Sequence, residues 1–353
     1  MGIKQRQQHL QQQQHNSLLL NIEKLIPESV IQLLRSANDK LKAQRALPSS
    51  SSTLTPDSSK LFAPKDFFYA IYNKDGEDRI AEIVASGFSL LTPLKEFHNG
   101  TCLHLISNFG TLTMAYLILC RANSHNFINM FDKEMRTAAM CAVLGKRIDI
   151  LKLLCQCGAD VTIKGPEGMT VLHLSAKIGN FQATLAILEH YRQIATISKL
   201  EKFINTTDDG HWTALVWAAE NGHTEIVNYL ISLGADPNIC DSENNTVVHW
   251  AALSGRLDSI YPLLSNSDLN IQNVHGDTAL HIACRQSKTK LCLLLLANGA
   301  GLNIKNIANE LPVDCILDQK NECARLLKLN MELRKIGIGG WKSSNGEKLI
   351  LCT

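Results

Sequence analysis

The segment "DTALHIAC" (residues 277–284) decides the fold, because variants of it recur along the chain. They are "GTCLHLIS" (100–107), "RTAAMCAV" (136–143), "MTVLHLSA" (169–176), "WTALVWAA" (212–219), "NTVVHWAA" (245–252) and a degenerate seventh, "ELPVDCIL" (310–317). The leading threonines, from Thr101 to Thr278, are spaced by 36, 33, 43, 33 and 32 residues. One such unit cannot bury its own apolar face, so the period predicts a stack of repeats with a shared core.

The pattern T-x-L-H-x-A, with G-A-D near the end of the unit, resembles the ankyrin repeat. That family builds each repeat from a turn, two antiparallel helices and a projecting finger loop. The resemblance covers roughly 66–335 and implies an all-α ankyrin-repeat solenoid of about seven repeats, assigned here to 64–340. The stretch 66–87 is predicted to be an N-terminal capping unit. The long interval contains "HYRQIATISKLEKF" (190–203), which predicts a longer second helix and finger.

The ends of the chain have a different composition. Residues 1–63 are predicted to form a disordered Gln/Ser-rich head, since "KQRQQHLQQQQH" and the Ser-rich linker at 47–59 cannot build a core. Within the head, 27–46 is predicted to be an amphipathic helix with Ile31, Leu34 and Leu41 on one face. It is interpreted either as a partner-docking helix or as a marginal surface helix. Residues 341–353 are interpreted as a truncated linker.

Composition excludes several classes of function. A net charge of +2 over 353 residues does not indicate a nucleic-acid binder, and no apolar run is long enough for a membrane span. The eleven cysteines are interpreted as reduced, buried side chains. Only Cys155 and Cys157 form a close pair, so we predict neither metal nor cofactor. Because no P-loop, G-x-S-x-G or H-E-x-x-H motif is present, no catalytic residue is predicted.

Position within the repeat predicts the direction of each side chain. The recurring His104, His173, His249 and His281 are predicted to satisfy backbone groups at the helix start. The residue after each histidine position is predicted to point outward, and the set is Leu105, Leu174, Trp217, Trp250 and Ile282. The residue before each threonine is predicted to lie exposed on the finger, and the set is Gly100, Arg136, Met169, Trp212, Asn245 and Asp277.

Three tryptophans therefore gather at outward positions. Trp217 and Trp250 are equivalent in successive repeats, whose helices pack about 8–10 Å apart. A cation between the two indoles would lie within about 6 Å of each ring, the range of cation–π attraction. Trp212 on the finger supplies a third wall, and Glu220 lies on the helix face of Trp217. This pattern favours an aromatic cage for a methylated ammonium. A general hot spot for protein binding, or cover for a neighbouring side chain, explains it as well.

A closer resemblance is carried by residues 208–260, 273–287 and 132–154, and by the tail "LNMELRKIGIGG…GEKLILC" (329–352). These stretches resemble the ankyrin domain of the euchromatic histone-lysine methyltransferases. The resemblance implies a reader of mono- and dimethylated lysine 9 on the histone H3 tail, in a nuclear context of chromatin and transcriptional repression. The family's methyl-lysine-binding positions correspond to Trp212, Trp217, Glu220 and Trp250.

Acidic finger residues extend this prediction. Asp241, Glu243 and Asp277 are candidates to line a peptide groove for a basic tail, although solvated finger carboxylates explain them equally well. Mono- and dimethyllysine keep an N–H that Glu220 can accept, so trimethyllysine is expected to bind less well. The predicted partners are the methylated histone H3 tail and other chromatin proteins, without nucleic acid or membrane.

The sequence also departs from the resembled family. That family continues into a cysteine-rich zinc module and a SET methyltransferase domain, whereas this sequence ends at Thr353. Binding without catalysis is therefore expected, and a fragment, a short isoform and a diverged stand-alone reader stay open. The other functions considered are a non-catalytic piece of a histone-lysine methyltransferase and a generic ankyrin scaffold for a folded partner.

Overall fold

The computed structural model describes residues 26–46, 62–73, 76–121, 125–317 and 322–335. These residues are helical, and among them the only β pairing is two isolated bridges, so the predicted all-α class is confirmed. The head segment 1–16, the linker 47–59 and the tail 341–353 lie outside the described residues. No helix in the described ranges is both long and apolar enough to cross a membrane.

Antiparallel helix pairs account for most of the described chain, as the resemblance to ankyrin repeats implies. Six pairs are present in its described part: α3 (Pro64–Tyr72) with α4 (Gly76–Ala85), α5 (Cys102–Phe109) with α6 (Leu112–Leu119), α8 (Ala138–Leu144) with α9 (Ile148–Gln156), α13 (Ala214–Asn221) with α14 (Thr224–Ser232), α15 (Val247–Ser254) with α16 (Leu257–Ile260) and the 3₁₀ turn η3 (Tyr261–Leu263), and α17 (Ala279–Arg285) with α18 (Thr289–Ala297). The helices α10 (Val171–Ile178) and α11 (Phe181–Ile194) follow α9 in the chain.

The chain divides into two compact units, the first made of residues up to 174 together with 182–194. Within it, the predicted capping stretch 66–87 lies in α3 and α4, and the one-turn helix α7 (His125–Ile128) follows α6. The stretch predicted as an amphipathic helix is α2 (Glu28–Ala46), which packs on α4 and α6. Val30, Ala37 and Leu41 are its buried side chains. The predicted apolar face is right for Leu41, whereas Ile31 and Leu34 are only half-buried, because the buried stripe runs through Val30 and Ala37 instead.

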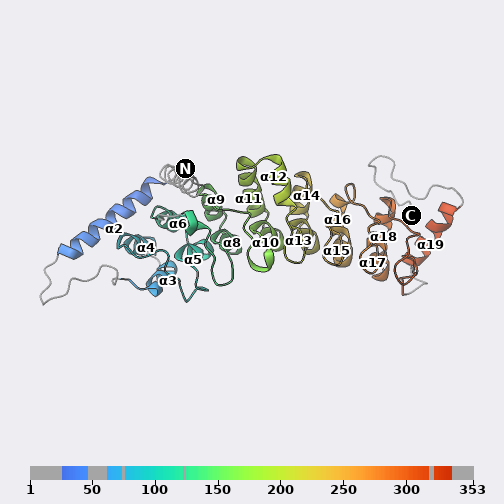
Figure 1. The fold of residues 1–353 in the computed structure, drawn as a ribbon, viewed down its shortest axis with the longest axis horizontal. Coiled ribbons are helices and arrows are strands. Elements are labelled where there is room, and N and C mark those ends of the chain that lie inside the picture. The colour runs from blue at the N-terminus through green and yellow to red at the C-terminus, as the bar shows by residue number, and fades with distance from the viewer. Residues whose placement is uncertain (1–25, 47–61, 74–75, 122–124, 318–321, 336–353) are drawn as a thin grey trace, which may run out of the picture. The chain divides into compact units, whose positions relative to one another are not determined.

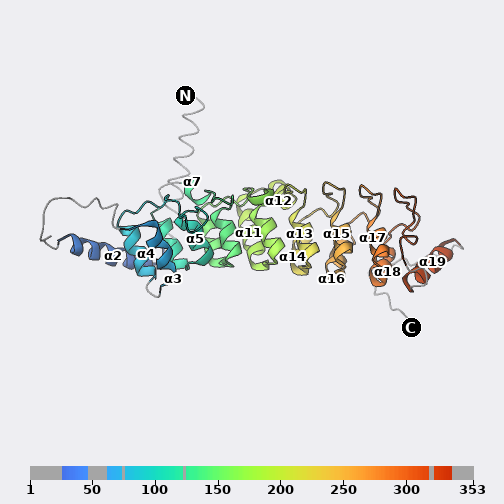
Figure 2. The ribbon, with the colours of Figure 1, turned by 90° about the horizontal axis from the view of Figure 1, so that it is seen from below.

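The second unit consists of 175–181 and the chain from residue 195 onward. Here the first helices α13, α15 and α17 pack side by side in sequence order, with their second helices α14, α16 and α18 above them in the view of Figure 1. The connecting loops project as fingers from one edge of this stack (Figure 2). Residues Leu215, Ala218, Val248 and Ala251 are buried, so the helix face opposite Trp217 and Trp250 builds the shared core.

The first helices that carry a histidine three residues after the threonine start through one recurring hydrogen-bond pattern. The N–H of Thr246 donates to Nδ1 of His249 at 3.1 Å, and the Nε2–H of that ring donates to the carbonyl of Asp277 in the next finger at 3.1 Å. The same pattern joins His281 to Thr278 and to the Glu310 carbonyl. Burial lowers the pKa of His249 and His281, which keeps both rings neutral. The predicted structural role of the repeat histidines is therefore observed.

The fingers turn through a left-handed residue two positions before each threonine. His211, Asn244 and Gly276 take φ values of 63°, 61° and 72° there. The carboxylate of Asp208 accepts the backbone N–H groups of Gly210 and Trp212, at 3.0 and 2.9 Å, and so fixes the first of these turns. The finger conformation is thus set by a short polar side chain at its base and places the next residue against the helix face.

The long interval between repeats contains an extra element. The second helix α11 has 14 residues, so the predicted lengthening is confirmed. The remaining inserted residues form the helix α12 (Ile197–Ile204) rather than a longer finger, because Leu200, Phe203 and Ile204 provide an apolar face that is buried. At the other end, 310–317 forms turns instead of a first helix, and α19 (Glu322–Lys335) follows.

Several predicted exposures are wrong. Leu105 is fully buried, in a region where α3 packs against α5. Gly100, Met169, Asn245 and Asp277 are also buried, and the last two lie under their fingers and hydrogen-bond to the next finger, at Asn273 and Asn306. Trp212 is half-exposed, since its ring is too large to be covered in the same way.

Candidate functional site

Trp217 and Trp250 occupy equivalent, half-exposed positions on α13 and α15. The Nε1–H of Trp217 donates to Asp208 Oδ2 at 2.8 Å, and the Nε1–H of Trp250 donates to Asp241 Oδ2 at 2.9 Å. Each aspartate stands nine residues before its tryptophan, at the base of the same repeat's finger. Both indoles are therefore held in the same orientation by charge-assisted hydrogen bonds that a flexible surface tryptophan would lack.

Trp212 brings the three rings together. Its ring centroid lies 4.6 Å from that of Trp217 and 4.5 Å from that of Trp250, with an interplanar angle of 53° in both pairs. Rings at this separation are in direct contact. Trp212 is thus the common neighbour of the other two indoles, and the three form one tilted aromatic surface, called here the tryptophan site.

The chain places one of its own cations on this surface. Lys177 on α10 holds its Nζ 4.0 Å from the centroid of the Trp217 ring. The contact shows that the face of Trp217 toward the preceding repeat attracts an ammonium group. Lys177 was not among the predicted site residues, because only its distance to the ring in the folded chain identifies it.

Glu220 lies three residues after Trp217 on α13 and is half-buried. Within the described residues its carboxylate makes no hydrogen bond or ion pair. Its position on the tryptophan-bearing face of the helix leaves it available to a bound cation.

The three predicted groove carboxylates differ in their surroundings. Asp241 is engaged at the finger base, where it also accepts the N–H groups of Glu243 and Asn245 at 2.9 and 2.7 Å. Glu243 is exposed and reaches only Asn245 Nδ2, at 3.5 Å. Asp277 is buried, so of the three only Glu243 is free to meet a ligand at the surface.

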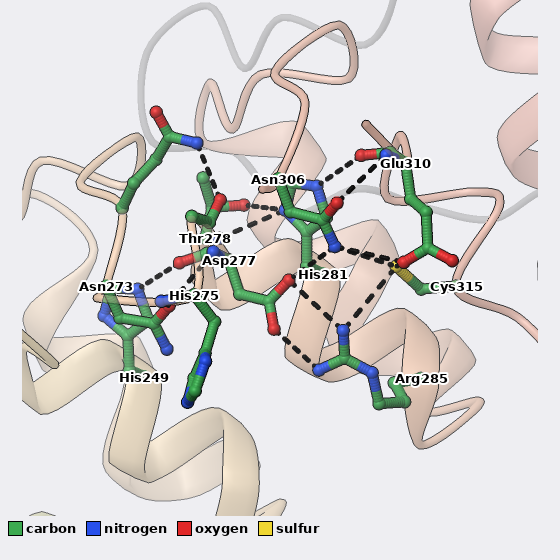
Figure 3. A network of polar contacts seen from close by, with 12 residues as sticks. His249, Asn273, His275, Asp277, Thr278, His281, Arg285, Asn306, Glu310 and Cys315 are labelled. Carbon is green, nitrogen blue, oxygen red and sulfur yellow. Dashed lines mark hydrogen bonds and ion pairs between the residues drawn. The ribbon is translucent and has the colours of Figure 1, made fainter. Parts of the chain in front are cut away.

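Asp277 belongs to a polar network at the following finger (Figure 3). Arg285 donates to it from both terminal nitrogens, at 2.7 and 3.2 Å, and Asn306 Nδ2 donates to it at 2.9 Å. Burial alone would raise the pKa of Asp277, but these hydrogen bonds outweigh burial and lower it. The network continues to Glu310 and Cys315 and ties the last repeat to the finger. Asp277 is a structural carboxylate in this arrangement.

A cavity of about 220 Å³ lies beside Trp250, on the side of the next repeat. Trp250, Leu253 and Ile282 are its apolar lining, and Glu243, Asp277 and Arg285 are the charged residues around it. It is called here the Trp250 cavity. Trp250 is therefore shared between the tryptophan site and this cavity.

The described residues contain no cluster of three or more His, Cys, Asp or Glu side chains that could hold a metal ion. Cys155 and Cys157 are buried, and burial raises the pKa of both thiols to about 12. Both therefore remain protonated, as expected of cysteines that act as small core residues.

Sequence reasoning missed the residues that orient the tryptophans. Asp208 and Asp241 carry a detectable signal, since an aspartate precedes each outward tryptophan by nine residues. Arg285 and Asn306 carry no such signal, because their role depends on Asp277 being buried.

Comparison with known proteins identifies the class. The family described as ankyrin repeats in three copies matches residues 67–165, 163–241 and 230–306, which together exceed half of the chain. The chain therefore belongs to the ankyrin-repeat family, whose members bind protein partners and are generally non-catalytic.

Individual relatives match over the repeats. The transient receptor potential cation channel subfamily A member 1 of Homo sapiens is 29% identical over 57% of this chain and 18% of that protein. The nuclear factor NF-kappa-B p105 subunit of Gallus gallus is 27% identical over 52% of this chain and 18% of that protein. The chain thus spans less than a fifth of the length of these relatives.

Solved structures agree on the fold. The ankyrin repeat domain of Bcl-3 aligns with a TM-score of 0.57 and 21% identity, covering 64% of this chain and 97% of that chain. The human ASB11 ankyrin repeat domain aligns with a TM-score of 0.53 and 23% identity, over 64% and 96% respectively. At these identities the likeness shows the fold alone.

Proposed function

We propose that this ankyrin array binds a peptide carrying a mono- or dimethylated lysine at the tryptophan site. The observation that supports the proposal is the paired orientation of Trp217 and Trp250 by Asp208 and Asp241, with Trp212 against both rings. Two half-exposed indoles held in fixed orientations, with a third ring against both, offer π faces to a weakly hydrated cation at little cost in side-chain entropy.

The ring contacts define how the ligand would enter. Since Trp212 touches both other indoles, a methylammonium group fits either in the notch between two tilted rings or in the place of the Trp212 ring. Trp212 stands on a finger, whereas the other two stand on helices. We therefore expect Trp212 to be the ring that moves on binding and Trp217 and Trp250 to stay in place.

Glu220 would supply the charge and the hydrogen-bond acceptor. Mono- and dimethylated lysine each retain an N–H on the ammonium, which a carboxylate can accept. Trimethyllysine has no such donor, so its binding would depend on the rings alone. A preference for the lower methylation states is expected on this ground.

The particular peptide, the histone H3 tail methylated at lysine 9, is proposed from the resemblance of 208–260 to the euchromatic histone-lysine methyltransferases. A nuclear location and a role in chromatin repression belong to the same proposal. A longer histone-lysine methyltransferase that contains this array is the related proposal, which sequencing the transcript past the codon for Thr353 would test.

A second candidate is a generic scaffold for a folded protein partner, and the comparisons favour it because they support protein interaction by ankyrin repeats without specifying a ligand. The direct contact between the indoles also fits this candidate, since a continuous aromatic surface is typical of a hot spot. The two candidates differ in one property, since a scaffold would bind its partner irrespective of lysine methylation.

Calorimetric titration of the full chain with H3 tail peptides tests the proposal. The peptides carry un-, mono-, di- or trimethylated lysine 9, and Trp250→Ala is the control variant. Binding of the mono- and dimethyl peptides, together with loss of binding in the variant, supports a reader. Equal binding of all four peptides, or of none, contradicts it and leaves the scaffold.

A further inference from the structure

The Trp250 cavity lies one repeat beyond the tryptophan site and has no role in the function proposed above. We infer that this cavity is a second pocket of the same peptide surface and takes the guanidinium of an arginine two or three residues from the methylated lysine. The inference rests on the proposed function for the peptide, but the pocket adds Glu243, Leu253 and Ile282 to the shared Trp250.

The lining of the cavity suits a long side chain with a cationic end. Trp250, Leu253 and Ile282 provide apolar surface for an aliphatic stem. Among its charged residues, the Glu243 and Asp277 carboxylates outnumber the single guanidinium of Arg285, so the cavity carries one net negative charge. Because Arg285 is already paired with Asp277, the remaining carboxylate is that of Glu243.

Glu243 lacks a cation of its own. It is exposed and makes no ion pair within the described part of the chain, and no cation of that part lies over the ring of Trp250. By contrast, the corresponding ring of the preceding repeat, Trp217, is covered by Lys177. The Trp250 cavity thus combines an aromatic ring and a carboxylate, the two groups between which a guanidinium binds best.

The first unit contains an internal example of this arrangement. Arg136 pairs with Asp132 at 2.7 Å and with Glu134 at 2.8 Å, and its guanidinium carbon lies 5.8 Å from the centroid of the Phe97 ring. Asp132 and Glu134 stand five and three residues before Thr137. A finger of this chain therefore binds an arginine with two carboxylates and one ring.

The finger before Thr246 has the same two carboxylates but a different residue directly before the threonine. Asp241 and Glu243 also stand five and three residues before their threonine, whereas Asn245 takes the place of the arginine. Asn245 is buried; its Oδ1 accepts from Asn273 Nδ2 at 2.9 Å, and its Nδ2 makes only long, uncharged contacts with Asp241 and Glu243, at 3.4 and 3.5 Å. No cation of the described residues neutralises Glu243 at this finger, so an arginine from a ligand would pair with it as Arg136 pairs with Glu134, while Asp241 stays engaged with Trp250.

The distance between the two sites sets the position of the arginine. Neighbouring repeats place equivalent helices about 8–10 Å apart, and an extended peptide advances about 3.3 Å per residue. Two or three residues therefore bridge the tryptophan site and the Trp250 cavity, with the length of the arginine side chain covering the remainder.

Fluorescence anisotropy of the full chain with labelled peptides tests this inference. The peptides consist of Ala, Gly and Ser around one lysine, either dimethylated or unmodified, with one arginine placed in turn at each of the four positions on either side. We expect arginine two or three residues from dimethyllysine to strengthen binding about fivefold, and citrulline at the same position to give no gain.

The variant Glu243→Gln should abolish the gain and change the affinity for the arginine-free dimethyllysine peptide by less than about twofold, because an exposed rim charge contributes little by itself. Glu225→Gln, which removes an exposed glutamate from α14, is the matched control and should keep the gain. An affinity independent of arginine position, or a gain that survives Glu243→Gln, overturns the pocket.

The anisotropy results differ according to whether the pocket or the proposed function is wrong. If dimethylation raises the affinity but arginine does not, the pocket is wrong and the methyllysine site stands. If arginine raises the affinity in a Glu243-dependent way but dimethylation does not, the pocket stands and the proposed function is wrong. Absence of binding to every peptide contradicts both.

Discussion

The tryptophan site and the Trp250 cavity occupy equivalent places between successive repeats, yet they present different chemistry. The first lies between α13 and α15 and exposes Trp212, Trp217 and Glu220. The second lies between α15 and α17, where the corresponding positions are Asn245, Trp250 and Leu253. The backbone of the repeat therefore supplies the location, and three side-chain positions in each repeat decide what can bind there.

The finger bases differ in a correlated way. Asp208 and Asp241 each accept an indole N–H in addition to backbone N–H groups. The next finger has Asn273 at this position, and the residue nine positions later is Ile282, which has no N–H to donate. Asn273 still accepts the backbone N–H groups of His275 and Asp277, both at 3.0 Å. A carboxylate is present at the two finger bases that precede an outward tryptophan.

The largest effect is expected at the finger base, which fixes the turn through backbone N–H groups and, where it is an aspartate, also orients the indole. Asp208→Ala removes the acceptor of two backbone N–H groups and of the Trp217 indole, and should lower the free energy of unfolding by about 1–3 kcal/mol. Asn273→Ala should destabilise by a similar amount. Only Asp208→Ala should alter the near-ultraviolet circular dichroism of the tryptophans, measured beside urea unfolding. An unchanged tryptophan spectrum would contradict the role of Asp208 in orienting Trp217.

Trp250 is the residue common to both sites, so its removal should affect both. Trp250→Ala should weaken binding of a dimethyllysine peptide by about 1–2 kcal/mol, or roughly 5- to 30-fold, through loss of a cation–π contact. It should also abolish the gain from arginine. Trp217→Ala should weaken dimethyllysine binding but keep the arginine gain, as measured by anisotropy. Identical behaviour of the two variants would show that the sites are not distinct.

Glu220 is a further difference between the tryptophan site and the Trp250 cavity, because the equivalent position in the next repeat is the apolar Leu253. Glu220→Gln should weaken the mono- and dimethyllysine complexes by about 1 kcal/mol through loss of a charged acceptor, and leave the trimethyllysine complex nearly unchanged. Calorimetry with the three peptides measures this. An equal loss for all three methylation states would mean that Glu220 acts only through its charge.

A variant of Lys177 tests the contribution of the cation that the chain itself places over Trp217. Lys177→Met removes the ammonium from the face of Trp217 while keeping an unbranched side chain, and should reduce the free energy of unfolding by about 0.5–1 kcal/mol. The variant should not affect the Trp250 cavity. Urea unfolding and the arginine gain together check this expectation, and a loss of the arginine gain would contradict it.

Lowering the pH should weaken the fold, because the histidines at the helix starts are buried. Burial lowers the pKa of His104, His249 and His281 below the ordinary histidine value of about 6.5, so the neutral rings stabilise the folded state. The unfolded chain binds more protons below about pH 6.5, and stability is expected to fall as the pH decreases from there. His281→Gln should reduce the slope of stability against pH. A stability that rises on acidification would contradict the neutral, hydrogen-bonded histidines.

The sequence was sufficient for the fold because threonine and histidine recur three residues apart at four helix starts, where the threonine N–H donates to the histidine Nδ1 each time. It also identified Trp212, Trp217 and Trp250, which the structure brings into contact. The predicted placement of Trp217 and Trp250 on the outward side of the first helices is confirmed for these two residues.

Other features depend on contacts that a repeat pattern does not encode. The burial of Asp277 follows from Arg285 and Asn306, which lie 8 and 29 residues away. The burial of Leu105 was missed because its position in the repeat is outward elsewhere in the array. The helix α12 was predicted as a longer finger, since its apolar face becomes visible only when Leu200 and Phe203 are read at helical spacing.

The most direct test of the cage is to compare two peptides that differ only in charge. One carries dimethyllysine and the other its neutral carbon isostere, of the same shape, and the affinity of the full chain for each is measured by calorimetry. Binding through the faces of Trp212, Trp217 and Trp250 predicts that the charged peptide binds more tightly, by about fivefold or more. Equal affinity would show that the rings only bury apolar surface, and would contradict recognition of a methylated ammonium.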